Sequence, residues 1–342
     1  MRIIIYFVLT WFFQSSVLSK DLYVTKEYNI EFVSENLQLK KNEYLNSIKK
    51  EGFVKLLSLF LKNYERNALA KDINTDFVNS FIFSIDIYEE KINNNNYSSK
   101  VKIAYDNSKI IDYFISNDIN FVPYQPEKFL LIIYDQKLFS EKILTSENSF
   151  YKYLSNNKNL FEYFTIPKLD INDRFIIKKN DFISKKIKNY EKLINKYNNP
   201  NILLIHSIND LSGIHINSYI YKDDNFILLD DTFFSEINYE VFFANLNKKL
   251  IEYWKNTNLV NVSKKNIIKC RIKTLNLIEL KKIKEIIMNN TMIRNLSANK
   301  ISFNNSIYDL IYIGDLNILK NSLNYQKVEL KLNNKKCNIK IL

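Results

Sequence analysis

Glycine and proline, the residues that most often make turns, are scarce in this sequence. Among its 342 residues there are 3 Gly and 4 Pro. The turns must therefore come from Asn, Asp and Ser, whose side chains bond to nearby backbone groups and tolerate tight conformations. Asn pairs occur at Asn94-Asn95, Asn304-Asn305 and Asn333-Asn334, and we expect turns there.

Arginine is also scarce, although the chain carries a formal net charge of +12. A basic surface can bind nucleic acid or an anionic membrane by releasing counterions. However, Arg is the side chain that binds phosphate and base edges in a bidentate manner, and only five of the 49 basic residues are Arg. We interpret the Lys residues as solvated surface spread along the chain, and we expect no nucleic-acid partner.

The sequence lacks an apolar run of the roughly 20 residues that a membrane-spanning helix needs. The N-terminal run from Ile3 to Phe13 is short, follows Arg2 and precedes Val17-Leu18-Ser19. This is the pattern of a cleaved signal peptide. We therefore predict a signal peptide at residues 1–19, a mature chain that begins near Lys20, and no transmembrane segment after cleavage. The protein is then expected to be secreted.

The segment from Phe81 to Phe121 has the pattern of a strand, an Asn-rich turn, a second strand, a short helix and an extended exit. It follows a β-rich segment, Leu22 to Phe32, and a stretch with helical spacing, Leu37 to Leu61. Together they predict a β-α-β-β-α-β domain with a four-stranded antiparallel sheet and both helices on one face. Gly52 interrupts the helical stretch, which marks either a kink or a cost of about 1 kcal/mol relative to Ala.

A similar pattern returns from Ile267 and ends with an additional strand, Cys337 to Ile341. Between the two, the apolar runs Phe129 to Tyr134 and Ile202 to Ile205 indicate strands buried on both faces. We therefore predict a chain of mixed α+β and α/β class, with two split βαβ (ferredoxin-like) antiparallel-sheet domains that flank an α/β middle domain. The predicted boundaries are 20–125, 126–260 and 261–342.

The sequence contains only two cysteines, Cys270 and Cys337, in a compartment that would permit a disulfide. In a split βαβ sheet the strand after the second helix, here Val328 to Leu332, borders the first strand. Cys337 would then lie two strand spacings from Cys270, about 9.6 Å, which exceeds the roughly 7 Å that a disulfide allows between Cα atoms. The sequence thus predicts two buried, unpaired thiols that act as small hydrophobic residues.

No nucleophile, metal cluster or phosphate-binding loop stands out. Both histidines, His206 and His215, lie in the middle domain, where they could serve as a proton shuttle with Asp230 or Asp231. The structural interpretation is stronger, because His215 alternates with Ile on a strand and His206 ends a buried strand. Their spacing of nine residues matches no metal motif.

A second candidate is the acidic loop around Asp170, Asn172 and Asp173, followed by Arg174. Loops at strand ends often bind ligands in α/β sheets, and three oxygen donors could hold a hard cation. The loop lacks the twelve-residue calcium pattern, and Asp173 could simply cap a helix or pair with Arg174. The candidates for ligand binding are thus Asp170, Asp173, Arg174, His206 and His215. We predict no catalytic residue, no metal and no cofactor.

Several stretches together resemble a known family. They are the secreted N-terminus, an early helix leading to Ala68-Leu69, the strand Tyr97-x-x-x-Val101-x-Ile103, the apolar run Phe129 to Tyr134, the loop Pro167-x-Leu169-Asp170-x-x-Asp173, and Trp254-Lys255. In this order of elements the chain resembles the bacterial envelope family catalogued as domain of unknown function 2066, although that family normally carries more Gly and Arg. The resemblance implies a periplasmic or envelope location in a Gram-negative bacterium and no established activity.

Two functions follow as expectations. The first is a secreted, non-catalytic envelope protein that acts through protein-protein contacts with an unknown envelope partner, since exposed sheet edges suit recognition by backbone pairing. The alternative is a periplasmic hydrolase or small-ligand-binding enzyme that uses the middle domain, although no small-molecule substrate is indicated. A joint site would require His206, His215 and the Asp170 loop to lie together.

Overall fold

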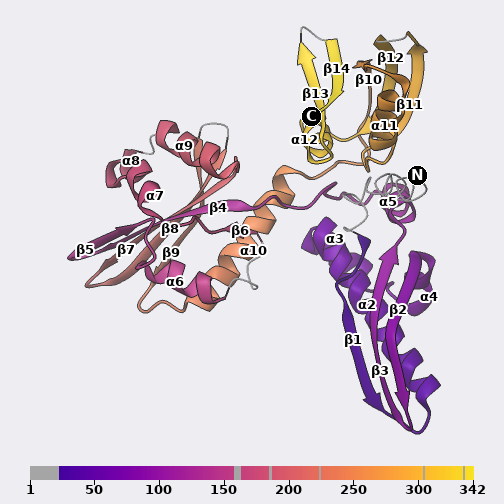
Figure 1. Cartoon of the computed structure of the whole chain (residues 1–342), viewed down its shortest axis with the longest axis horizontal. Helices are drawn as coiled ribbons and strands as arrows, with labels where there is room; N and C mark the ends of the chain where they lie inside the picture. Colours follow the sequence, from indigo (N-terminus) through magenta and orange to yellow (C-terminus); the bar gives the residue numbers. More distant parts are fainter. Residues whose placement is uncertain (1–22, 158–162, 185–186, 223–224, 303–304, 334–335) are drawn as a thin grey trace, which may run out of the picture. The chain divides into compact units, whose positions relative to one another are not determined.

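A computed structural model describes residues 23–157, 163–184, 187–222, 225–302, 305–333 and 336–342. The predicted signal peptide, residues 1–19, lies outside the described residues. The chain contains helices and three sheets, so the predicted mixed α and β class is confirmed (Figure 1). It divides into two compact units: unit 1 comprises Met1–Gln125 and Asn258–Leu342, and unit 2 comprises Pro126–Thr257.

The N-terminal part of unit 1 is a three-stranded antiparallel sheet in the order β1-β3-β2. Its face is covered by the long helix α2, and Figure 1 shows β1 as the outer strand. Successive side chains of β3 point to opposite faces of the sheet. Tyr97, Val101 and Ile103 are therefore buried under the helix, while Lys100 and Lys102 lie on the open face. The elements are β1 (Tyr28–Val33), α2 (Leu37–Phe60), α3 (Asn63–Leu69), α4 (Thr75–Ser80), β2 (Ile82–Asn93), β3 (Asn96–Tyr105) and α5 (Asn107–Ser116).

The predicted fourth strand of this sheet, near Phe121, is absent from it. Phe121 instead forms an isolated antiparallel bridge with Val260, and its carbonyl accepts the Val260 N–H at 2.8 Å. The next residue, Val122, donates its N–H to the Phe60 carbonyl at the end of α2, at 2.9 Å. The exit segment is thus held by contacts with α2 and with the start of the C-terminal part. Among the described residues, β1 pairs with β3 on one side and with no strand on the other.

Gly52 lies inside α2, which runs without interruption from Leu37 to Phe60. A Cβ atom at this position would lie 2.7 Å from the Tyr105 Oη atom and 2.8 Å from the Thr25 Cγ2 atom. The glycine therefore allows the helix to approach the sheet closely, and it marks no break in the helix.

The C-terminal part of unit 1 is a five-stranded sheet in the order β11-β12-β10-β14-β13. Buried side chains of α11, Leu280, Ile283 and Ile287, indicate the helix face that packs inward. The elements are β10 (Lys265–Lys273), α11 (Leu277–Met288), β11 (Ile293–Lys300), β12 (Asn305–Ile313), α12 (Leu316–Tyr325), β13 (Val328–Asn333) and β14 (Lys336–Ile341).

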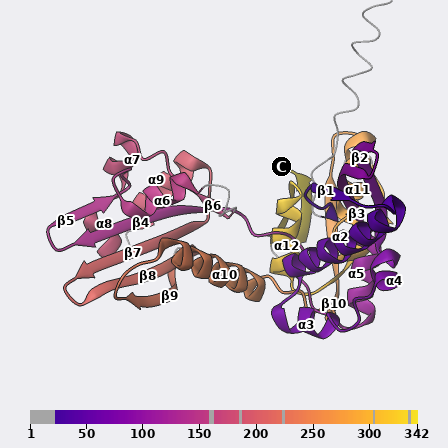
Figure 2. The same ribbon diagram turned by 90° about the horizontal axis from the view of Figure 1, so that it is seen from below.

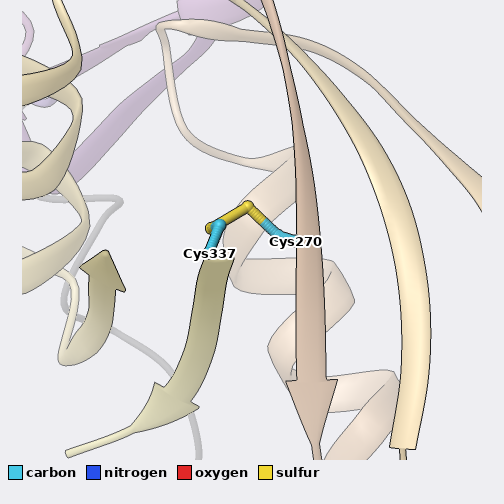
Figure 3. The surroundings of a disulfide bond; sticks show 2 residues. All are labelled: Cys270 and Cys337. Carbon is cyan, nitrogen blue, oxygen red and sulfur yellow. A yellow bond between two sulfur atoms is a disulfide. The ribbon is translucent and has the colours of Figure 1, made fainter. Parts of the chain in front are cut away.

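The predicted strand neighbours of β10 and the predicted free thiols are wrong. β14, and not β13, borders β10, and it runs parallel to it with Cys270 opposite Cys337. The two cysteines form a disulfide with a Cα–Cα distance of 4.4 Å (Figure 3). β14 is therefore bonded on both sides, to β10 and to β13, and its residues Cys337 and Ile339 are buried.

Unit 2 is a sheet in the order β5-β4-β7-β8-β9, with β6 paired to the start of β4. β4 and β7 are parallel, and the remaining neighbours along this order are antiparallel. Helices α7, α8 and α9 lie on one face and α6 and α10 on the other (Figures 1 and 2), which is why β4 is buried on both faces. The elements are β4 (Phe129–Lys137), β5 (Ser140–Ile143), α6 (Ser149–Asn156), β6 (Phe164–Thr165), α7 (Ile171–Ile176), α8 (Lys179–Ser184), α9 (Ile187–Tyr197), β7 (Ile202–Asp210), β8 (Gly213–Lys222), β9 (Asn225–Phe234) and α10 (Tyr239–Thr257).

Candidate functional site

The acidic loop of unit 2 is a helix start whose carboxylates already have partners. Asp170 caps α7, because its Oδ1 atom accepts the N–H of Asp173 at 2.9 Å. Asp173 is fully buried, and its Oδ2 atom accepts the Leu169 N–H at 3.0 Å and the Tyr197 hydroxyl at 2.5 Å. The Lys196 ammonium lies 2.6 Å from the Asp173 Oδ1 atom and 3.2 Å from the Asp170 Oδ1 atom.

These contacts determine how the loop titrates. The hydrogen bond from the Asp173 N–H, with help from Lys196, lowers the pKa of the Asp170 carboxyl. Burial, followed by the bond to Asp173, raises the pKa of Tyr197 to about 12. Arg174 points elsewhere and donates from Nη2 to Thr145 Oγ1 at 2.9 Å. The side chains of the loop thus link α7 to α9. No group of metal-ligating side chains occurs in the part of the chain that the structure describes.

The two histidines lie on one face of the sheet but in different surroundings. His206 of β7 stacks on Tyr134 with ring centroids 4.7 Å apart, and its buried Nε2 atom has no hydrogen-bond partner among the described residues. Burial lowers the pKa of His206, so the ring is neutral at pH 7. His215 is exposed on β8 and packs against Phe233. Since His206 is paired with Asn217, His215 lies two residues further along the same face.

The structure therefore brings the histidines near each other and leaves the acidic loop apart. No hydrogen bond, ion pair or ring contact among the described residues joins either histidine to Asp170, Asp173 or Arg174. The carboxylates satisfy helix ends, and the neutral His206 ring packs against an aromatic side chain.

A different feature, the free edge of β1, offers a binding surface. The Ser34 N–H donates to the Asn95 carbonyl at 2.9 Å. In an antiparallel pair the hydrogen-bonded residues alternate, so the even-numbered residues of β1 bond to β3. Asn29, Glu31 and Val33 therefore direct their N–H and C=O groups away from β3, where no described strand lies.

The other edge of this sheet, β2, is protected in ways that β1 is not. Its pairing with β3 shifts register between Ile82 and Ser84 and again between Tyr88 and Lys91. Glu89 adopts a positive φ of 54° in the second irregularity. Bulges and charged residues are the usual means by which proteins prevent edge pairing. β1 pairs with β3 without a shift from Tyr28 to Val33, so its edge remains regular.

A row of stacked aromatic rings includes Phe32 of the edge strand β1. The Phe32 ring stacks on Tyr97 of β3 at 4.9 Å and on Tyr44 of α2 at 5.2 Å. Both rings are nearly parallel to Phe32, with interplanar angles of 7° for Tyr44 and 22° for Tyr97. Tyr44 is 38% exposed, so an aromatic surface next to Phe32 of the edge strand reaches solvent.

The open face of the same sheet is already occupied by paired charges. The Lys100 ammonium lies 2.9 Å from Glu89 and 3.5 Å from Glu27, and the Tyr88 hydroxyl donates to Glu27. The bond from Tyr88, ahead of the attraction of Lys100, lowers the pKa of Glu27. A partner would have to break this network to lie on the face, whereas the edge offers unpaired backbone groups.

Sequence reasoning named exposed sheet edges in general but missed the edge residues Asn29, Glu31 and Val33. It assigned a strand near Phe121 that would have covered an edge of this sheet. The signal against that strand was local: Pro123 follows Phe121 closely, and the stretch from Ile119 to Tyr124 is continuously apolar except for Asn120. Such a stretch suits burial on all sides better than a half-exposed strand.

Comparison with known proteins adds no assignment. No protein-family model matches the chain, and no curated protein matches it. The resemblance to the family of domain of unknown function 2066 stays a prediction. The functional argument must therefore come from the geometry of the chain itself.

Proposed function

We propose that this chain is a secreted, non-catalytic protein of the bacterial envelope that recognises a protein partner through the free edge of β1. The observation that carries the proposal is the regular, unprotected edge at Asn29, Glu31 and Val33. Backbone groups that point into solvent at such an edge can pair with an extended segment of another chain. The recognition would then need no catalytic residue and no cofactor.

The second half of unit 1 supports this interpretation. β10 occupies the same place in its sheet as β1, next to the third strand of its own part, and its other edge is filled by β14. We propose that both halves follow one split-βαβ plan and that β1 lacks the strand that β10 has. The Cys270–Cys337 disulfide suits an oxidising compartment such as the periplasm.

The surroundings of β1 define the chemistry of the partner segment. Side chains on its inner face would meet Tyr44 and Phe32, so apolar residues should occupy alternate positions. Side chains on its outer face would meet the exposed carboxylate of Glu31, which favours Lys or Arg opposite it. The segment is thus an extended, alternating apolar and basic stretch of an envelope protein.

The alternative, a periplasmic enzyme, would depend on polar groups of unit 2 that belong to different structural clusters. Asp170 and Asp173 bond to Lys196 and Tyr197, and His206 packs on Tyr134. No observation in unit 2 favours a reaction over these structural roles.

The test uses a proline at a position whose N–H faces the free edge. Glu31→Pro removes an outward donor and keeps the bonds to β3, whereas Glu31→Ala removes only the side chain. A photoreactive residue at Asn29 should cross-link one envelope protein in cells. We expect Glu31→Pro to abolish that cross-link and Glu31→Ala to retain most of it. An identical cross-link in the Glu31→Pro variant would show that β1 pairing is not used.

A further inference from the structure

The positive charge of the chain is concentrated in its last part. Residues 258–342 contain sixteen Lys and Arg against five Asp and Glu, a net charge of +11 out of the total +12. The Lys residues themselves are spread along the chain, with 14 of the 44 in this part, but only five of the 37 acidic residues lie here to offset them. An electrostatic role, which the sequence discounts for the whole chain, has to be judged for this part separately.

Large apolar side chains are exposed at one end of the same sheet. Leu275, Leu277 and Ile278, where β10 leads into α11, are 83%, 68% and 82% exposed. Two further residues lie at this end, namely Ile301, which is 70% exposed, and Leu342, which is 62% exposed.

The register explains why these five residues share one end of the sheet. Lys273, the last residue of β10, is opposite Asn305, the first of β12, so Ile301 in the connection before β12 lies at the end where β10 stops. β14 runs parallel to β10, with Ile339 opposite Ile272, so Leu342 follows at the same end. We call Leu275, Leu277, Ile278, Ile301 and Leu342 the apolar tip.

The tip is held in a defined shape. Asn276 caps α11 by accepting the Glu279 N–H at 2.9 Å, and the Glu279 carboxylate accepts the Leu275 N–H at 2.7 Å. This reciprocal bonding resembles a capping box, except that Glu279 binds the residue before the cap. Since Leu280 and Ile283 face the core, the helical period directs Ile278 outward. Leu277 is the first residue of α11 and is 68% exposed at the helix start.

Five lysines surround the tip: Lys273, Lys281, Lys282, Lys300 and Lys327. Among the described residues only Lys281 of these has an ion pair, to Glu285 at 4.0 Å. A shallow groove of about 480 Å³ continues along α11, where Lys281 and Lys284 lie between Leu277 and Met288 on the helix. The surface therefore combines exposed aliphatic side chains with neighbouring ammonium groups.

We infer that the apolar tip docks on the surface of an anionic lipid bilayer. The aliphatic side chains would enter the headgroup region, and the surrounding ammonium groups would bind lipid phosphates. A nucleic acid would use the lysines but gain nothing from five exposed aliphatic residues. A protein partner would need a matching cavity for each projecting side chain, whereas a fluid lipid surface adapts to them. This inference is independent of the proposed function of β1.

Binding to vesicles tests the inference directly. The purified chain without residues 1–19 is sedimented with vesicles of phosphatidylcholine, pure or with about 30% phosphatidylglycerol. We expect binding only to the anionic vesicles, and we expect it to weaken strongly between about 50 and about 500 mM salt. Lys281→Glu with Lys282→Glu should weaken binding by about 25-fold or more, since each nearby Lys contributes about fivefold.

The apolar contribution has its own variant and a matched control. Leu275→Ser with Ile278→Ser should reduce binding by about tenfold or more while the fold is retained, because both side chains are exposed. The control is Leu138→Ser with Phe139→Ser in unit 2, where Phe139 is 98% exposed but the tip is absent. The control should bind vesicles as the unchanged chain does, and so should Glu31→Pro.

Three results would overturn the inference. The first is equal binding to neutral and anionic vesicles. The second is unchanged binding after the Leu275 and Ile278 substitutions, together with binding to single-stranded DNA at the same affinity, which would indicate a general polyanion site. The third is an equal loss in the Phe139 control, which would indicate non-specific adhesion of exposed apolar residues.

Discussion

The two parts of unit 1 differ at the outer edge of their first strand. β10 has β14 beside it and a disulfide from Cys270 to Cys337 across that contact, whereas β1 has no described strand beside it. In both parts the first strand pairs with the third, and the third pairs with the second. The same arrangement is therefore closed in one part and open in the other. In the first case the backbone groups of the first strand are paired within the chain on both sides, and in the second case one side of the strand keeps unpaired groups.

Loss of the disulfide should have the largest effect on this difference. The bridge links residues 67 positions apart, and the loop-entropy relation then gives about 4 kcal/mol of stability for the C-terminal part. Cys270→Ala with Cys337→Ala should therefore raise amide hydrogen exchange in β10, β13 and β14. Exchange in β1 to β3 should stay as it was. If hydrogen exchange rose equally in both parts, the disulfide would not stabilise the C-terminal sheet in particular, and the contrast would be wrong.

Loss of the stacked aromatic rings at the open edge should have the second-largest effect on stability. Phe32→Ala removes two stacked contacts, to Tyr44 and Tyr97, and should lower the free energy of unfolding of the N-terminal part by about 2 to 3 kcal/mol. Val33→Ala on the same strand is the matched control, because Val33 is 72% exposed. Urea unfolding followed by hydrogen exchange in β1 and β3 measures both. A similar small loss in the two variants would show that the row adds little.

A smaller effect is expected from the helix that covers the open sheet. Gly52→Ala would gain about 1 kcal/mol from helix propensity, but its Cβ would clash with Tyr105 and Thr25. We expect a net loss of about 1 kcal/mol, because crowding a packed interface costs roughly 1 to 3 kcal/mol. Ser47→Ala, at an exposed position of the same helix, should instead be neutral or slightly stabilising. If Gly52→Ala stabilises the protein, α2 can move away from the sheet.

The smallest effect on stability should come from the edge itself. Glu31→Pro should change the free energy of unfolding by less than about 1 kcal/mol, because its N–H faces away from β3. Ile30→Pro removes a bond to β3 and should cost about 3 kcal/mol or more. Thermal unfolding of the two variants measures the contrast. Equal losses would place the Glu31 N–H in the ladder with β3 and contradict the free edge.

Local patterns in the sequence predict the local structure well. Alternation along β3, with Val101 and Ile103 buried between Lys100 and Lys102, places that strand and its inner face. The helical spacing that begins at Leu37 likewise predicts the start of α2. These features depend only on neighbouring residues and on the period of each element.

The choice of strand neighbours could not be predicted in the same way. Cys337 alternates with Ile339 and Ile341 whether β14 lies at the edge of the sheet or beside β10. Only long-range pairing, across 67 residues, distinguishes the two arrangements. Similarly, Phe121 is apolar both as an edge strand and as a buried exit that bridges to Val260.

The candidate site was partly anticipated. The sequence places a helix cap in this loop, but the cap is Asp170 and not Asp173, and Asp173 does not pair with Arg174. Its partners Lys196 and Tyr197 come from α9 and carry no sequence signal. The exposed edge of β1 was missed at the level of residues, because a free edge is defined by what does not lie beside it. No pattern within Tyr28 to Val33 distinguishes a strand with one neighbour from a strand with two.

The position of β14 also sets the order in which the protein can be completed during synthesis. β14 is the last of the five strands of its sheet to leave the ribosome, yet it lies between β10 and β13. β13 is synthesised earlier, but among the described strands it pairs only with β14 and so cannot join the sheet until β14 has been made. The β1-β3-β2 sheet, in contrast, has all its strands by residue 105. The free edge of β1 can therefore form before the last strand of the C-terminal part has been made.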